Sequence, residues 1–194
     1  MTLPALILAA GGSRRLGRPK QLVRVEDEPL LARALRVARE SGAQPVVVVL
    51  GGSLHQVQGS VDVSGAVVVL NEHWMQGIAS SIHAGLHAIE HRCPDANGVL
   101  IVACDQPRLS AEHLRRMIES FEQHGAQKLV ASGYASTLGI PAAFPRSHFS
   151  KLFELEGDRG ARSLLLDALE QVIEIPFAGG EIDIDTPEDL RFFE

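Results

Sequence analysis

The sequence has few cysteine and aromatic residues, no excess of basic residues and no long hydrophobic run. Its two cysteines, Cys93 and Cys104, are neither at CxxC spacing nor near histidines at zinc-finger intervals, so neither a disulfide framework nor a structural zinc site is expected. Lysine and arginine number 18 against 24 acidic residues, and the net charge of -6 argues against nucleic acid or an anionic membrane as partner. The apolar start lacks a basic leader and reaches glycines after about ten residues, too short to span a bilayer. A cytoplasmic protein is therefore expected.

The overall composition of the chain is typical of one globular domain. Of the 194 residues, 45% are hydrophobic and 22% are charged. A chain of this length buries about 70% of the surface that its unfolded form exposes, so it needs no disulfide or structural metal to stabilise it.

Short runs rich in valine, isoleucine and leucine alternate with segments of helical period. Continuous hydrophobicity is typical of strands that are buried on both faces of a mostly parallel sheet. The expected strands are Leu3–Ala9, Pro45–Leu50, Ala66–Leu70, Gly98–Ala103, Lys128–Ala131, Leu138–Phe144 and Val172–Ile175. The expected helices are Pro29–Glu40, Gly77–Glu90, Ser110–His124, Ser147–Glu154, Ala161–Glu170 and one after Pro187. This order predicts a doubly wound, three-layer α/β/α fold of Rossmann type, with its ligand site beyond the carboxyl ends of the strands.

A glycine-rich loop follows the first expected strand. It reads Ala9-Ala10-Gly11-Gly12-Ser13-Arg14-Arg15-Leu16-Gly17-Arg18-Pro19-Lys20. Glycines let backbone amides approach phosphate oxygens, and the arginines and the lysine add positive charge. The loop departs from the P-loop pattern because Gly17 is followed by Arg18 and Pro19, and its third glycine is out of place for the dinucleotide-binding fingerprint. The residues indicate a phosphate-binding loop of another kind.

This loop resembles the signature of the MobA-like NTP transferase family, which activates phosphorylated acceptors with NTPs. It is most similar to the branch that contains molybdenum cofactor cytidylyltransferase, because of the Ala9-Ala10 pair and the short gap before Lys20. The resemblance implies catalytic roles for Arg15 and Lys20, whose charges offset those of the triphosphate. It implies nucleotide binding by Ala9, Ala10, Gly11, Gly12, Ser13 and Lys20.

The segment from Asn71 to Ile82 resembles a second block of the same family. Gly77 opens an expected helix whose first-turn amides are free for a ligand. Ser80 and Ser81 lie in that turn and are expected to contact the nucleotide. Serines near a helix start are also ordinary caps. Trp74, the only tryptophan, either stacks on a ligand ring or anchors the packing, and the second interpretation is favoured.

A third family-like block places Asp105 directly after the strand Gly98–Ala103 and Cys104. A carboxylate at the end of a central parallel strand points into the ligand crevice, and Mg²⁺ takes one or two carboxylates together with phosphate oxygens. Asp105 is therefore the expected Mg²⁺ ligand. Cys104 is expected to be a small core residue rather than a nucleophile, and Ser110 to cap the following helix.

The C-terminal third contains three more blocks that resemble the family. The residues implied to bind the acceptor are Gly139, Pro141, Asp158, Arg159 and Arg162. Arginine suits a phosphate, but Asp158 and Arg162 could equally form a salt bridge at a helix start. In the last block, a strand over Glu181–Asp185 would place Asp183 and Asp185 on one face, where two carboxylates favour a cation between them. The resemblance implies that these aspartates assist Asp105 at the metal, and it leaves open which of the two binds the ion. Thr186 is expected to cap the last helix.

Taken over nearly the whole chain, the resemblance implies a Mg²⁺-dependent nucleotidyltransferase. It implies transfer of CMP from CTP to the phosphate of molybdopterin, giving molybdopterin cytosine dinucleotide and pyrophosphate, with a molybdenum hydroxylase as recipient of the product. One domain, residues 1–194, would have its NTP-binding half in 1–110 and its acceptor-binding half in 111–194. The alternatives are GTP as donor, another small phosphorylated acceptor, or a non-catalytic chaperone that binds nucleotide and cofactor. The chaperone is disfavoured because the chain retains the residues with implied catalytic or metal-binding roles, namely Lys20, Asp105, Asp183 and Asp185.

Overall fold

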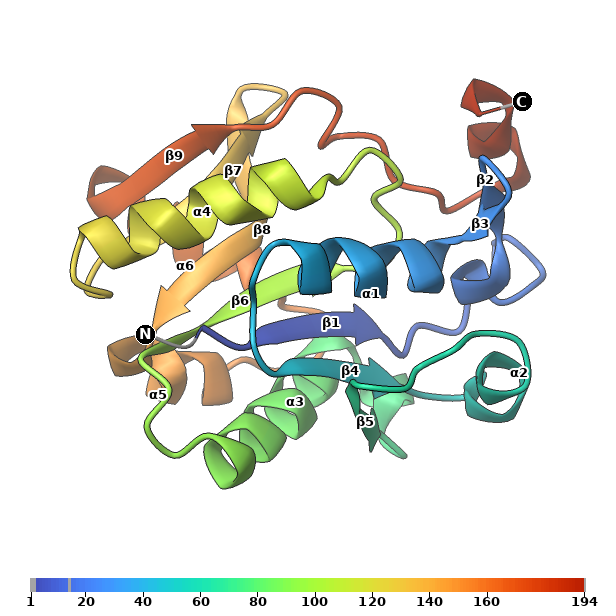
Figure 1. Cartoon of the computed structure of the whole chain (residues 1–194), viewed down its shortest axis with the longest axis horizontal. Helices are drawn as coiled ribbons and strands as arrows, with labels where there is room; N and C mark the ends of the chain where they lie inside the picture. The colour runs from blue at the N-terminus through green and yellow to red at the C-terminus, as the bar shows by residue number, and fades with distance from the viewer. Residues whose placement is uncertain (1–2, 14, 194) are drawn as a thin grey trace.

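The computed structural model describes residues 3–13 and 15–193, and a mixed β-sheet forms its centre (Figure 1). Within these residues the strand order of the main sheet is β5-β4-β1-β6-β8-β7-β9. The strands are β1 (Ala5–Ala9), β4 (Val46–Leu50), β5 (Val67–Leu70), β6 (Gly98–Ala103), β7 (Leu129–Tyr134), β8 (Thr137–Pro145) and β9 (Val172–Pro176). Strand β8 is antiparallel to β6 and β7, and the other neighbouring pairs are parallel. The expected α/β fold with a mostly parallel sheet is confirmed.

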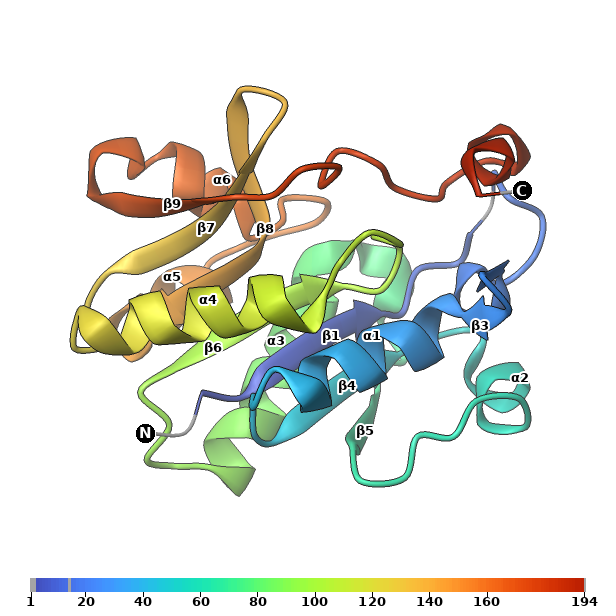
Figure 2. The ribbon, with the colours of Figure 1, turned by 45° about the horizontal axis from the view of Figure 1, so that its top comes forward.

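Helices cover both faces of this sheet (Figure 2). One face carries α1 (Leu30–Glu40) and α4 (Ala111–Gln123). The other carries α3 (Ile78–Arg92), α5 (Phe149–Phe153) and α6 (Arg162–Leu166). Alternate residues of the central strand β1 serve the two layers: Ile7 packs towards α1 and Leu6 towards α3. This explains why the central strands are apolar on both faces.

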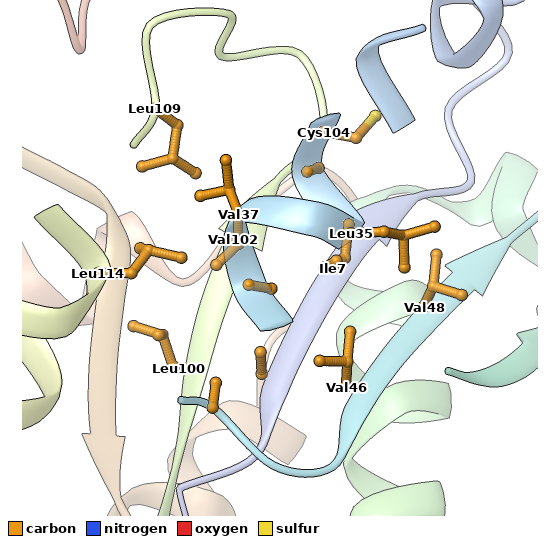
Figure 3. Packing of buried hydrophobic residues seen from close by; sticks show 14 of the residues in the cluster. Ile7, Leu35, Val37, Val46, Val48, Leu100, Val102, Cys104, Leu109 and Leu114 are labelled. Carbon is orange, nitrogen blue, oxygen red and sulfur yellow. The ribbon is translucent and has the colours of Figure 1, made fainter. Parts of the chain in front are cut away.

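Figure 3 shows the first of these layers, where Leu35 of α1 lies near Ile7 and Val48 of the sheet. Cys104 belongs to the same buried cluster, as expected for a core residue. On the other face, a Cβ atom at Gly85 would lie 2.2 Å from Cδ1 of Leu6. The missing side chain at position 85 therefore lets α3 approach β1 closely.

The helix boundaries follow from local chemistry. Ser110 is the N-cap of α4, as expected, since its Oγ accepts a hydrogen bond from the backbone N of His113 at 3.2 Å. The shorter elements are η1 (Lys20–Leu22), β2 (Arg24–Val25), β3 (Glu28–Pro29), α2 (Leu54–Gln58), η2 (Trp74–Gln76), η3 (Arg146–His148), η4 (Leu169–Gln171) and η5 (Pro187–Phe192). The last helix is thus a 3-10 helix. No helix in the described residues is long and apolar enough to cross a membrane.

The strand predicted over Glu181–Asp185 is wrong, because this segment is a loop that crosses the carboxyl ends of the parallel strands. Its anchor is Ile184, which is fully buried in a small cluster with Leu16, Val23, Val25 and Leu30. The backbone N of Ile184 donates to the carbonyl of Asp105 at 3.1 Å. Packing against distant segments, rather than sheet pairing, therefore fixes the C-terminal loop.

A buried histidine links α4 to the second half of the sheet. Nε2 of His113 lies 2.8 Å from Oγ of Ser132, which in turn donates to the carbonyl of Pro141 at 2.8 Å. The imidazole stacks on Phe177 with ring centroids 4.4 Å apart. Burial, with a smaller effect of Arg116, lowers the pKa of His113 to about 4.

This pKa predicts a specific loss of stability in acid. Between about pH 6.5 and pH 4, His113 is protonated in the unfolded chain but neutral in the folded one, so the free energy of unfolding falls as the pH falls through this range. The full effect is about 3 kcal/mol. Urea unfolding across this range should show a shallower pH dependence for His113→Gln than for the wild-type protein. His91→Gln, at an exposed position, is the matched control, and equal slopes in His113→Gln and wild type would contradict the prediction.

Candidate active site

A cleft with a volume of about 400 Å³ lies at the carboxyl ends of β1 and β6. It is formed by the glycine-rich loop, the start of α3 and the end of β6. The predicted site residues that line it are Ala9, Ala10, Gly11, Gly12, Lys20, Gly77, Ser81, Asp105 and Asp158. The fold therefore brings the first-half motifs together with one residue of the C-terminal third. Arg14 lies outside the described residues.

The ammonium group of Lys20 is the centre of the site's charges. Its Nζ lies 2.7 Å from Oδ2 of Asp105 and 2.6 Å from Oδ1 of Asp185. The exposed Arg15 adds a second contact to Asp185, with 2.6 Å between its terminal nitrogen and Oδ2. The Lys20 side chain is only 14% exposed, and the two carboxylates raise its pKa above the usual range despite the opposing effect of burial. Lys20 therefore stays protonated.

The backbone around Lys20 is fixed by short polar contacts. The N of Lys20 donates to Oγ of Ser13 at 2.9 Å, which closes the loop. Gln21, almost fully buried, donates from Nε2 to the carbonyls of Ala9 at 2.5 Å and Gly11 at 3.2 Å. Gln21 thus holds in place the backbone of Ala9 and Gly11, two of the residues that are predicted to bind the nucleotide. Sequence reasoning missed this residue, because a glutamine beside a lysine in a polar loop carries no signal of burial.

Asp185 reaches Lys20 because the C-terminal loop is anchored on both sides. Ile184 is buried before it, and Oδ2 of Asp189 accepts from the backbone N of Asp185 at 2.9 Å and of Thr186 at 2.7 Å after it. Thr186 is the N-cap of η5, as expected. The position of Asp185 is therefore set by the buried Ile184 and by Asp189, its neighbours in the C-terminal loop, although Asp105 lies far away in the sequence.

Asp183 belongs to the same acidic region but has a different environment. Desolvation by the surrounding protein, and then the charges of Asp105 and Asp185, raise the pKa of Asp183 to about 7, although its side chain keeps contact with solvent. Hydrogen bonding to Lys20 instead holds the pKa of Asp185 below its usual range. The geometry therefore separates the two aspartates, with Asp185 at the ammonium group and Asp183 beside it.

The carboxylates suit a divalent cation that shares its ligands with a substrate. Oxygens of Asp105 and Asp185 converge on one point, which Nζ of Lys20 takes. No group of three or more His, Cys, Asp or Glu residues in the described chain is arranged to hold a metal. Mg²⁺ is commonly bound by one or two carboxylates plus phosphate oxygens and water, so this donor set fits it.

The start of α3 is less open than the sequence predicts. The N of Ala79 donates to the carbonyl of Gly157 at 3.1 Å, so the expectation that all first-turn amides are free is wrong. Gly77 has φ of +108°, and a Cβ there would lie 2.2 Å from the carbonyl carbon of Gly157. Oγ of Ser80 and of Ser81 each accept from Asn71 at 2.9 Å. Ser81 lines the cleft, whereas Ser80 faces a neighbouring surface pocket.

The predicted acceptor residues are separated by the fold. Asp158 lines the cleft, but Arg159 lines another pocket, of about 290 Å³, together with His148 and Lys151. Arg162 donates to the carbonyl of Leu138 at 3.1 Å and to Oγ1 of Thr137 at 3.0 Å, rather than to Asp158. The salt-bridge interpretation of Asp158 and Arg162 therefore does not describe this segment.

The strand β8 contributes to the cleft through Ile140, which lies between the predicted residues Gly139 and Pro141. A Cβ at Gly139 would lie 2.0 Å from the hydroxyl oxygen of Tyr134, and Pro141 is buried. Gln106, the residue after Asp105, donates to the carbonyls of Ile140 and Gly180, both at 3.0 Å. Gly139 and Pro141 thus shape the strand, and Gln106 ties it to the end of β6.

Trp74 packs against glycines, which supports the favoured interpretation of a packing anchor. A Cβ at Gly12, Gly51 or Gly52 would lie 2.6 to 2.8 Å from atoms of the Trp74 side chain. The indole also lines the cleft. These glycines therefore make room for the ring that holds the glycine-rich loop against the end of β4.

This contact predicts different effects for two neighbouring glycines. Gly12→Ala should displace the indole of Trp74, because the new Cβ would lie 2.6 Å from it, whereas a Cβ at Gly11 meets nothing within 4 Å. Since Trp74 is the only tryptophan, its fluorescence emission reports this movement directly. Gly12→Ala should shift the emission maximum and Gly11→Ala should not. Identical spectra for both variants would contradict the packing.

With this geometry in place, comparison with known proteins identifies the family. Residues 5–172 match the MobA-like NTP transferase domain, and the chain belongs to this family. It is 29% identical to nicotine blue oxidoreductase of Paenarthrobacter nicotinovorans, over 95% of this chain and 93% of that protein. It is 28% identical to the purine catabolism protein PucB of Bacillus subtilis, over 96% and 93%. A probable molybdenum cofactor guanylyltransferase of Opitutus terrae is 33% identical over 56% of this chain and 50% of its own length.

Solved structures agree in fold over the whole chain. Rv0371c of Mycobacterium tuberculosis superposes with a TM-score of 0.85 and 31% identity, covering 99% of this chain and 97% of its own. A structure of Rv0371c in complex with manganese gives a TM-score of 0.82 and 29% identity, covering 100% and 98%. The family and the nucleotidyltransferase-like fold are thus established for this chain.

Proposed function

We propose that the protein transfers CMP from CTP to the phosphate of molybdopterin, forming molybdopterin cytosine dinucleotide and releasing pyrophosphate. The single observation that carries the proposal is the contact of Lys20 with Asp105 and Asp185 in the cleft beside Gly11 and Gly12. A cationic side chain, paired carboxylates and a glycine-rich loop are the parts that nucleotidyl transfer requires.

In this reaction an oxygen of the acceptor phosphate attacks the α-phosphorus of the nucleotide. The bond from that phosphorus to the bridging oxygen breaks, and pyrophosphate leaves with the electron pair. The backbone of the Gly11–Ser13 loop binds the phosphates, and Lys20 offsets the charge that develops on the leaving group. Mg²⁺, when bound by Asp105 and Asp185, would supply further positive charge at the α-phosphate. Asp158, which also lines the cleft, would contact the acceptor.

The choice of nucleotide and acceptor rests on similarity. The Ala9-Ala10 pair and the Cys104-Asp105-Gln106-Pro107 block favour CTP, and the Opitutus terrae relative is named for a molybdenum cofactor reaction. GTP and other small phosphorylated acceptors remain the alternatives within the same chemistry. A molybdenum hydroxylase would receive the product, and neither nucleic acid nor membrane is proposed as partner.

The reaction is tested by measuring pyrophosphate release. The protein is incubated with Mg²⁺, molybdopterin and each NTP in turn, and we expect release with CTP above that with GTP, ATP or UTP. Release with GTP alone would move the protein to the guanylyl reaction. Because one relative is named an oxidoreductase, oxidation of NADH and NADPH is measured in parallel. Oxidation without pyrophosphate release from any NTP would reject the transferase.

Two substitutions should separate catalysis from folding. Lys20→Ala and Asp105→Asn should each lower kcat by about 10²–10³-fold, because Lys20 supplies a positive charge that stabilises the transition state and Asp105 would hold the Mg²⁺ that supplies another. Lys128→Ala, which removes an exposed lysine just before β7, is the matched control and should keep wild-type kcat. Circular dichroism checks that each variant is folded. A folded Lys20→Ala with wild-type kcat would remove Lys20 from the mechanism.

A further inference from the structure

Lys20 fills the position from which both carboxylates of the site can be reached. Its Nζ is within 2.7 Å of an oxygen of Asp105 and of Asp185 at the same time. The Lys20 side chain is 14% exposed and that of Asp105 is 22% exposed, so little solvent separates these charges. The Asp185 side chain is 37% exposed, so the ammonium group in this ion cluster is held between one partly buried carboxylate and one at the mouth of the cleft.

A divalent cation cannot join this cluster as it stands. Mg²⁺ binds carboxylate oxygens at about 2.1 Å, so an ion that takes the two oxygens now in contact with Lys20, Oδ2 of Asp105 and Oδ1 of Asp185, would lie in the space that Nζ takes. The repulsion between a divalent ion and an ammonium group a few ångströms away is large in a site with little water. The lysine must leave before the metal can bridge the carboxylates.

The cleft offers one direction for that movement. Lys20 shares the cleft with Gly11 and Gly12, whose backbone would hold nucleotide phosphates. A triphosphate bound there supplies the negative charge that Lys20 loses when it leaves Asp105 and Asp185. The long, flexible lysine side chain suits such a change of partner.

We infer that Lys20 is an internal counter-ion that keeps divalent metal off Asp105 and Asp185 until a nucleotide triphosphate draws it away. Metal and nucleotide then bind together, and each strengthens the binding of the other. The inference rests on the proposed function only in taking an NTP as the anion that moves Lys20. It assigns Lys20 a role before the reaction, in addition to the charge it supplies during it.

Manganese binding without nucleotide tests this directly. Mn²⁺ is titrated into the protein, and free Mn²⁺ is measured by electron paramagnetic resonance. The wild-type protein should bind Mn²⁺ weakly, whereas Lys20→Met, which removes the charge but keeps most of the side-chain length, should bind it at least tenfold more tightly. Lys20→Gln is a second neutral variant with the same expected gain. Lys128→Met is the matched control, because it removes one lysine charge away from the cleft and should bind Mn²⁺ as the wild-type protein does.

The location of the bound ion is tested by a double variant. Lys20→Met with Asp105→Asn should lose the gain, since the ion then lacks a carboxylate. Mn²⁺ binding by both neutral variants that is no tighter than in the wild-type protein would overturn the inference, as would micromolar binding by the wild-type protein itself without nucleotide. Turnover plays no part in these titrations. Tighter Mn²⁺ binding by Lys20→Met, together with no pyrophosphate release by the wild-type protein from any NTP, would reject the transferase and leave the inference standing.

Discussion

The charges around Lys20 connect three segments that lie far apart in the sequence. The lysine comes from the loop after β1, Asp105 from the end of β6, and Asp185 from the C-terminal loop. Carboxylates this close would repel each other without a cation between them. The ion cluster therefore helps to hold the path of the chain after β9, back across the carboxyl ends of the strands, in addition to the burial of Ile184.

The sheet could be predicted from the sequence because its signal is local. A run such as Val46–Leu50 is buried at every residue, and a short run of this kind made mostly of β-branched valines is typical of a strand that is covered on both faces. The C-terminal loop could not be predicted in this way. Alternation in Glu181–Asp185 has the period of a strand, but Ile184 is buried in a cluster formed by residues of the first thirty or so positions. Contacts between distant segments leave no periodic pattern.

In the candidate site too, local sequence patterns identified some residues, whereas others act through contacts with distant segments. Lys20 and Asp105 could be found because each stands in a run of residues with a recognisable family pattern, and the structure brings them into contact. Gln21 and Gln106 could not, since their amides act on backbone carbonyls of other segments. For Arg159, the family pattern predicted a place in the site that the structure does not give it. Its neighbours match the family, but the turn of the chain directs Asp158 into the cleft and Arg159 into a different pocket.

The close approach of Gly77 and Gly157 makes two loops into one structural unit. The backbone of Gly77 packs directly against that of Gly157, and the backbone N of Ala79 donates a hydrogen bond to the carbonyl of Gly157. The cleft wall from the first half of the chain and the loop that carries Asp158 are therefore coupled through their backbones. A loop transplanted from a relative to replace the Asp158 loop would keep the shape of the cleft only if its backbone met Gly77 in the same way. The two loops are best regarded as one module, to be exchanged together or not at all.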